Sequence, residues 1–96
     1  MSDMIPDPET YFREMVPHHG PLFEALEAQA RREDIPIVGP LVGELLYILV
    51  RVTRAARVLE LGTATGYSAL FLAEACAATG GRLTTVEWDA ELARQA

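Results

Sequence analysis

The sequence predicts an α/β fold in which a set of helices precedes one β-α-β unit. Two observations support this class. Apolar residues recur at helical spacing in residues 1–56, whereas short continuous apolar runs bounded by turn residues occur in 57–96. A glycine-bounded loop at 62–66 joins one of these runs to a segment rich in alanine and leucine. We therefore divide the chain into an N-terminal helical segment, 1–56, and the first, incomplete β-α-β unit of a larger domain, 57–96.

Three helices are expected in the N-terminal segment. The first, at 7–16, begins with an aspartate, a proline and a glutamate, which are residue types that favour a helix start. The second, at 22–32, keeps its apolar residues on one face. An extended link at 37–40 leads to the third helix, 41–53, which is apolar almost all round and is therefore expected to be largely buried. Its acidic residue, Glu44, is expected to pair with a nearby arginine.

The second segment has the pattern of a parallel β-α-β unit. Residues 57–61 are expected to form a buried parallel strand, 67–78 a helix, and 82–86 a second strand parallel to the first. Asp89 is expected to cap a further helix that runs into Ala96. Because two parallel strands alone make a poor sheet, we expect the chain to be a fragment of a larger α/β domain.

Composition and charge argue against several classes of protein. A net charge of −6 disfavours nucleic acid or an anionic membrane as a partner. All eight basic residues are arginine, so a lysine base or a P-loop lysine is absent from this chain. The strongest apolar run, 41–50, is too short to span a bilayer, and the N-terminus does not resemble a signal peptide, so we expect a cytoplasmic protein. The single cysteine, Cys76, is expected to be an inert core thiol.

The glycine loop and the acids around it predict a cofactor site. Gly62 permits a sharp turn, and Gly66 opens a helix whose first N–H groups attract a carboxylate or phosphate. Ser68, in the first helical turn, adds a hydroxyl donor to the same anion. Glu60, at the end of one strand, can accept from an ammonium group, and Glu87, at the end of the next, can accept both hydroxyls of a ribose. An ammonium, a carboxylate and a ribose together describe S-adenosylmethionine (SAM).

Other glycine-loop sites fit the sequence less well. A dinucleotide fingerprint that starts at Gly62 needs glycines at the positions of Ala64 and Tyr67. A β-loop-α turn whose glycines serve the backbone alone stays open as the structural alternative.

The run at 58–70 reads V-L-E-L-G-T-A-T-G-Y-S-A-L, and it resembles the hallmark of SAM-dependent O-methyltransferases of the catechol and caffeoyl-CoA type. The resemblance extends to the upstream helices and covers nearly the whole chain. It implies the first β-α-β of a Rossmann-like class I methyltransferase sheet, truncated at Ala96. It also implies methyl transfer from SAM to a hydroxyl of a small, catechol-like or phenolic acceptor in the full-length protein, and this chain alone is expected to be inactive.

The resemblance further implies which residues meet SAM. Glu60 would contact the methionine part and Ser68 its carboxylate, while Glu87 would take the ribose hydroxyls. Ala64 departs from relatives that carry an aromatic residue at that position. The expected cofactor-binding residues are Val38, Glu60, Gly62, Thr63, Gly66, Ser68, Glu87 and Trp88, with Trp88 beside the adenine. No catalytic residue or metal ligand is identified in this chain, and a divalent metal, usually magnesium, is expected only in the full-length protein.

Several other residues have plainer interpretations. His18 and His19 are expected to have a loop or interface role rather than to bind metal. Tyr67 is expected to pack and fix the loop. Trp88 has packing under the following helix as an equal alternative to adenine stacking. The apolar patch at 11–15 is expected to join the core, with a dimer contact as the alternative.

The chain as a whole also has an alternative function. Its apolar third helix needs cover, and this favours a non-catalytic helical dimerisation module that associates through the N-terminal helices. The expected partners are a small-molecule methyl acceptor and a second copy of the chain, with no nucleic acid and no membrane.

Overall fold

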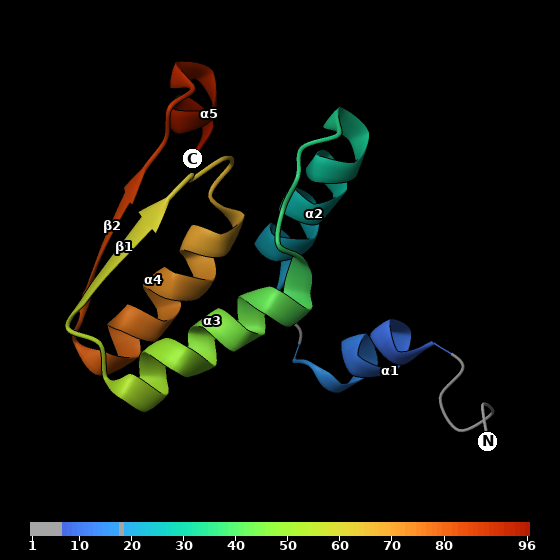
Figure 1. Cartoon of the computed structure of the whole chain (residues 1–96). Coiled ribbons are helices and arrows are strands. Elements are labelled where there is room, and N and C mark those ends of the chain that lie inside the picture. The colour runs from blue at the N-terminus through green and yellow to red at the C-terminus, as the bar shows by residue number, and fades with distance from the viewer. Residues whose placement is uncertain (1–6, 18) are drawn as a thin grey trace.

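The computed structural model describes residues 7–17 and 19–96 (Figure 1). The elements in this part of the chain are α1 (Pro8–Met15), α2 (Pro21–Glu33), α3 (Gly39–Thr53), β1 (Arg57–Leu61), α4 (Tyr67–Thr79), β2 (Arg82–Val86) and α5 (Ala90–Gln95). Every element expected from the sequence is present, and both strands have the expected bounds. Helix α3 begins two residues early, because Gly39 and Pro40 form its first turn.

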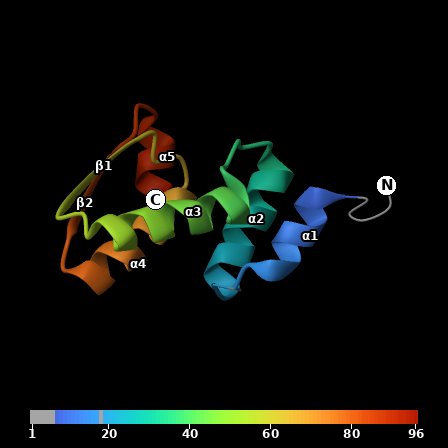
Figure 2. The same cartoon turned by 60° about the horizontal axis from the view of Figure 1, so that its bottom comes forward.

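The two strands form a parallel sheet, and α4 packs on one of its faces (Figures 1 and 2). The register pairs Arg57 with Arg82 at the start of the strands and Leu61 with Val86 at their end. The β1–α4 loop and the N-terminus of α5 therefore lie at the same edge of the sheet (Figure 1). Asp89 caps α5 as expected, since its Oδ1 accepts hydrogen bonds from the N–H groups of Glu91 and Leu92.

Helix α4 is the centre of the fold, because it packs against both the sheet and α3. One core cluster contains Val50, Leu72, Ala75 and Cys76, and this confirms the buried position of the cysteine. A second cluster contains Phe23, Tyr67 and Phe71. Gly43 lets α3 approach α4 closely, because a Cβ atom there would lie 2.4 Å from the ring of Phe71. The glycine loop is thus attached to the best-packed helix of the chain.

The expectations of burial for α3 and β1 were wrong. Val52 on α3 is 75% exposed and Leu61 on β1 is 77% exposed, and the apolar patch at 11–15 is also exposed. The physical reason is that α4 covers one face of the sheet and one side of α3. No described element packs on the opposite face of the sheet (Figure 2), and besides α4 only α1 makes more than a marginal contact with α3. Within the described residues, no helix combines the length and the apolar character needed to cross a membrane.

His19 joins the segment before α2 to both α3 and α4. Its Nε2 lies 2.6 Å from Glu44 Oε2 and its Nδ1 lies 3.4 Å from Glu74 Oε2. The expected pairing of Glu44 with an arginine was therefore wrong: the next basic residue on α3, Arg51, is seven positions away, roughly 10 Å along the helix axis. His18 lies outside the described residues.

Candidate functional site

The loop after β1 follows a backbone path that few residues can adopt. Gly62 has φ 95° and Gly66 has φ 94°, values that are accessible to glycine at little cost. Ala64 also lies in the left-handed region, at φ 50°. The N–H groups of Gly62 and Thr63 both donate to the carbonyl oxygen of Val86, at 2.8 and 3.1 Å. These two bonds attach the loop to the end of β2. The N–H groups of Gly62 and Thr63 therefore already have a hydrogen-bond acceptor within the protein.

Glu60 lies on the face of β1 that α4 covers, with both carboxylate oxygens engaged. Its Oε1 accepts a hydrogen bond from Thr85 Oγ1 at 2.8 Å, and its Oε2 accepts one from Ser68 Oγ. Each carboxylate oxygen has a second lone pair, so Glu60 can still accept from a ligand ammonium group. The single hydroxyl proton of Ser68, in contrast, is already donated to Glu60. Ser68 would therefore meet a ligand carboxylate through its backbone N–H, or would have to release Glu60 first.

Three threonines lie at the site, and two of them, Thr85 and Thr65, were not expected there from the sequence. The hydroxyl oxygens of Thr63 and Thr85 lie 2.5 Å apart. Thr65 Oγ1 is buried with no hydrogen-bond partner among the described residues, so it has a free donor and acceptor close to the start of α4. The register of the strands was the signal that could have found Thr85, because aligning their ends places Thr85 opposite Glu60.

Glu87 follows β2 and holds the other side of the loop. Its Oε1 accepts a hydrogen bond from the N–H of Ala64 at 2.6 Å, and its Oε2 accepts one from the N–H of Asp89 at 2.9 Å. The N–H groups of Asp89 and then Ala64 stabilise the carboxylate and hold the pKa of Glu87 below its ordinary value. Glu87 is therefore ionised at neutral pH and is aligned by the loop that it contacts.

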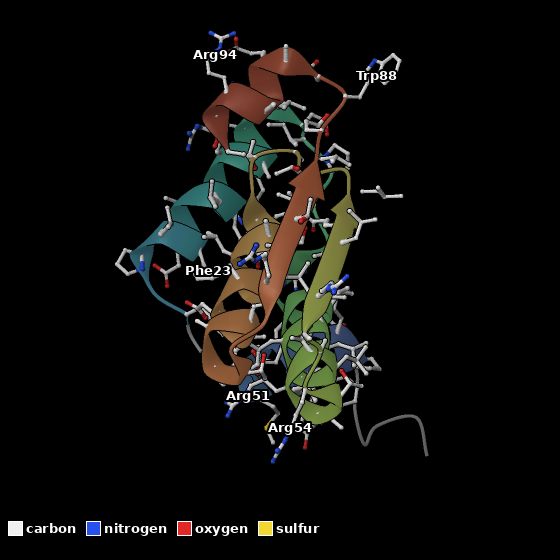
Figure 3. All side chains as sticks on the ribbon, turned by 90° about the vertical axis from the view of Figure 1, so that its left-hand side faces the viewer. Phe23, Arg51, Arg54, Trp88 and Arg94 are labelled. Atoms are coloured by element: carbon white, nitrogen blue, oxygen red, sulfur yellow. The ribbon has the colours of Figure 1, made fainter. Side chains whose placement is uncertain are left out.

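Trp88 does not pack under α5, and that expectation was wrong. Its side chain is fully exposed and points away from the molecule (Figure 3). The alternating direction of side chains at the end of an extended strand explains this, since Glu87 points to the loop and Trp88 to the other side. Its stacking on an adenine stays a prediction.

A small cleft of about 80 Å³ brings several predicted residues together. Val38, Gly62, Thr63 and Ser68 line it, and the remaining lining residues are Pro36, Ile37, Ala64 and Tyr67. The link before α3 thus faces the loop after β1. The cleft is smaller than the pockets of about 300 Å³ or more that enclose a whole ligand. It is therefore too small to enclose a whole cofactor-sized molecule.

Tyr67, the first residue of α4, anchors the end of the loop in the core. Its ring is buried between Phe23 and Phe71, and its hydroxyl donates to Glu27 Oε2 at 2.7 Å. Burial, followed by the hydrogen bond to Glu27, raises the pKa of the Tyr67 phenol. The expected packing role is confirmed.

The arrangement can bind a ligand that carries both a negative and a positive charge. The N-terminus of α4 favours an anion, while Glu60 and Glu87 accept hydrogen bonds from ammonium or hydroxyl groups. In the part of the chain that the structure describes, no three His, Cys, Asp or Glu side chains gather in a way that could hold a metal ion. The site is therefore chemically complementary to a small zwitterionic ligand that carries hydroxyl groups.

Comparisons with known proteins agree on one family. A family model described as O-methyltransferase matches residues 18–96. A human protein named Transmembrane O-methyltransferase is 48% identical over 60 residues, which are 62% of this chain and 20% of that protein. A Catechol O-methyltransferase from Niastella koreensis is 42% identical over 52 residues, which are 54% of this chain and 23% of that protein.

Solved structures give the same result for the fold. The crystal structure of the O-methyltransferase TomG from Streptomyces achromogenes, in complex with SAM, matches with a TM-score of 0.77 and 34% identity. The match covers 90% of this chain and 39% of that one. The chain thus spans about a fifth of the length of the curated relatives that it matches.

Proposed function

This chain belongs to the O-methyltransferase family, and we propose that its β1–α4 loop forms part of the SAM site of a SAM-dependent O-methyltransferase. The observation that carries the proposal is the cleft in which the link before α3 meets the glycine loop, with Glu60 and Glu87 hydrogen-bonded to its walls through Ser68 and Ala64. The presence of SAM in the related TomG structure supports the identity of the ligand.

In this proposal each part of SAM meets a different group of the site. Glu60 accepts from the ammonium group, and the N-terminus of α4, with Ser68, binds the carboxylate. Gly62 and Thr63 line the methionine portion, and Val38 closes the cleft from the link before α3. The buried, unpaired hydroxyl of Thr65 is a further group that a bound ligand could satisfy.

The nucleoside would occupy the edge of the sheet beyond the cleft. There, Glu87 accepts the two ribose hydroxyls and Trp88 stacks on the adenine. Gly66 contributes the turn that brings the first N–H groups of α4 to the ligand. Bound SAM would supply an electrophilic methyl group for transfer to the acceptor hydroxyl, and S-adenosylhomocysteine would remain.

For the full-length protein we propose a small acceptor with a catechol-like or phenolic hydroxyl. The name of the Niastella koreensis relative supports this acceptor class. We also propose that a divalent metal, usually magnesium in such enzymes, is held by residues outside this chain. Metal would assist by lowering the pKa of the acceptor hydroxyl.

Calorimetric titration of SAM into the protein tests the site. Glu87→Ala removes the acceptor for the ribose hydroxyls and should weaken binding by about tenfold or more, since hydrogen bonds to a charged group are each worth about 1.5–3 kcal/mol. Glu33→Ala, at the exposed end of α2, removes the same charge from a position outside the cleft lining and should leave affinity nearly unchanged. Unchanged affinity in Glu87→Ala would refute the assignment, provided that circular dichroism shows both variants folded.

A second function is favoured by the exposed side of α3. Val42, Leu45, Leu49 and Val52 are all exposed and follow the spacing of a heptad seam. We propose, as the alternative, that the chain is a helical dimerisation module that pairs with a second copy through this stripe.

Sedimentation velocity at micromolar concentration distinguishes this alternative. A dimer that dissociates in a Leu45→Glu/Leu49→Glu variant supports it, because charge in an apolar seam is unfavourable. The matched Glu substitutions of Leu59 and Leu61, on the exposed face of the sheet, should leave such a dimer intact. A well-folded monomer of the unaltered chain contradicts the dimerisation module.

A further inference from the structure

Four arginines lie at the end of the molecule opposite the glycine loop. Arg51 and Arg54 lie at the C-terminus of α3, Arg57 begins β1, and Arg82 begins β2. All four are exposed, and they are half of the eight basic residues of a chain whose net charge is −6. We call these four residues the basic end. Figure 3 shows Arg51 and Arg54 there, far from Trp88 and Arg94 at the other end.

Two of these arginines are held next to each other by the sheet. Arg57 and Arg82 are partners in the register of β1 and β2, and the alternation of burial puts both on the face away from α4. Neighbouring strands are about 4.8 Å apart, so the two arginine side chains leave the sheet next to each other on the same face. Like charges in this arrangement destabilise the sheet. An anion that bridges them would remove this cost.

The other two arginines line a cleft between helix ends. An open cleft of about 320 Å³ lies where the C-termini of α3 and α4 meet, and it is lined by Arg51, Arg54, Ala78 and Thr79. The guanidinium of Arg51 is oriented by Tyr47: Nη1 donates to the phenol oxygen at 2.9 Å, and the guanidinium carbon lies 5.5 Å from the ring centroid. One arginine is therefore already ordered, with further N–H donors available in the cleft.

The positive charge of the basic end is not neutralised by acidic side chains. Within residues 7–17 and 19–96, none of the four guanidinium groups makes an ion pair. Two helix C-termini contribute partial negative charges of roughly half an elementary charge each. Most of the four positive charges therefore stay available for an external anion.

We propose that the basic end binds a compact anion with two or more phosphate groups. Arginine suits phosphate because its planar guanidinium donates two parallel hydrogen bonds to phosphate oxygens. The acidic remainder of the chain repels a long polyanion, whereas a compact anion can occupy the cleft lined by Arg51 and Arg54, with Arg57 and Arg82 adding positive charge at the same end of the molecule. The phosphates can belong to a free small molecule or to lipid headgroups at a surface, since both offer the same oxygens.

Calorimetric titration of pyrophosphate into the full chain at low ionic strength tests this site. An Arg51→Gln/Arg54→Gln variant should bind pyrophosphate about tenfold more weakly or worse, because charge-assisted hydrogen bonds to two guanidinium groups are lost. The matched control is Arg31→Gln/Arg32→Gln, which removes the same charge from the exposed end of α2. It should change affinity by no more than about twofold, the size of effect expected for screened surface charges.

Co-sedimentation with vesicles then separates the two sources of phosphate. Binding to vesicles that contain phosphatidylserine, displaced by pyrophosphate and lost in Arg51→Gln/Arg54→Gln, identifies lipid headgroups. Binding of pyrophosphate without vesicle binding identifies a free anion. The proposal is overturned if the unaltered chain binds neither, or if both double variants weaken pyrophosphate equally while circular dichroism shows them folded.

Discussion

The two ends of the β1–β2 sheet differ in how their charged side chains are held. At the carboxyl end, Glu60 and Glu87 each accept two hydrogen bonds, all from neutral hydroxyl or N–H donors. At the amino end, Arg57 and Arg82 are register partners of like charge, and neither makes an ion pair with a described residue. The acids are therefore fixed in place without being neutralised, whereas the arginines keep their donors available.

The direction of the backbone explains this difference. The carboxyl ends of parallel strands lead into loops and helix N-termini, where free N–H groups stabilise carboxylates. The amino ends follow the C-termini of α3 and α4, where free carbonyl groups favour guanidinium groups (Figure 1). In this β-α-β unit the carboxylate acceptors thus lie at the carboxyl ends of the strands, and the guanidinium donors lie at their amino ends.

The largest effect is expected for Thr85→Val at the carboxyl end. The substitution keeps the shape of the side chain but removes the donor to Glu60 and the partner of Thr63. Leaving buried polar groups unsatisfied should lower the free energy of unfolding by about 1–3 kcal/mol. Urea denaturation measures this change. Thr84→Val, on the exposed face one residue earlier, should change it by no more than about 0.5 kcal/mol. Equal effects at both positions would contradict the support that we assign to Thr85.

A smaller effect of opposite sign is expected for Arg57→Thr at the amino end. Removing one member of the Arg57–Arg82 pair relieves repulsion between like charges and introduces a residue suited to strands. The free energy of unfolding should rise by about 0.2–1 kcal/mol at low ionic strength. Denaturation in high salt is the control, because screening should remove most of the electrostatic gain. A loss of stability at low salt would show that the two arginines do not repel each other.

The β-α-β unit was predictable because its signals are local. The strand bounds, the loop glycines, the cap at Asp89 and the two acids at successive strand ends all follow from residue type and spacing. Glu60 contacts the first turn of α4 and Glu87 contacts the loop before it, because parallel strands end at one edge of a sheet. These features depend on residue type, spacing and the parallel direction of the two strands more than on how the helices pack.

The exposure of α3 and the partner of Glu44 were not predictable in the same way. An apolar residue such as Leu61 indicates that a surface prefers to be covered, but the sequence does not say whether a covering layer is present. Glu44 reaches His19, which is 25 residues away, only because α3 and the segment before α2 pack together. The hydrogen bond from Ser68 to Glu60 likewise depends on how α4 is seated on the sheet.

The smallest effect is expected for the protonation of Glu87, because this carboxyl is only partly buried. The N–H donors of Asp89 and Ala64 hold its pKa below the ordinary value of 4.5, so the folded protein binds this proton less readily than the unfolded chain. The stabilising contribution of Glu87 is therefore complete above pH 4.5 and is lost as the pH falls through the lower, folded-state value. Carbon-13 NMR titration of the Glu87 side chain should give a midpoint below 4.5 in the folded protein and the ordinary midpoint in urea. A folded-state midpoint at or above the ordinary value would mean that the loop does not hold the carboxylate, and the contrast between the two ends of the sheet would then rest on Glu60 alone.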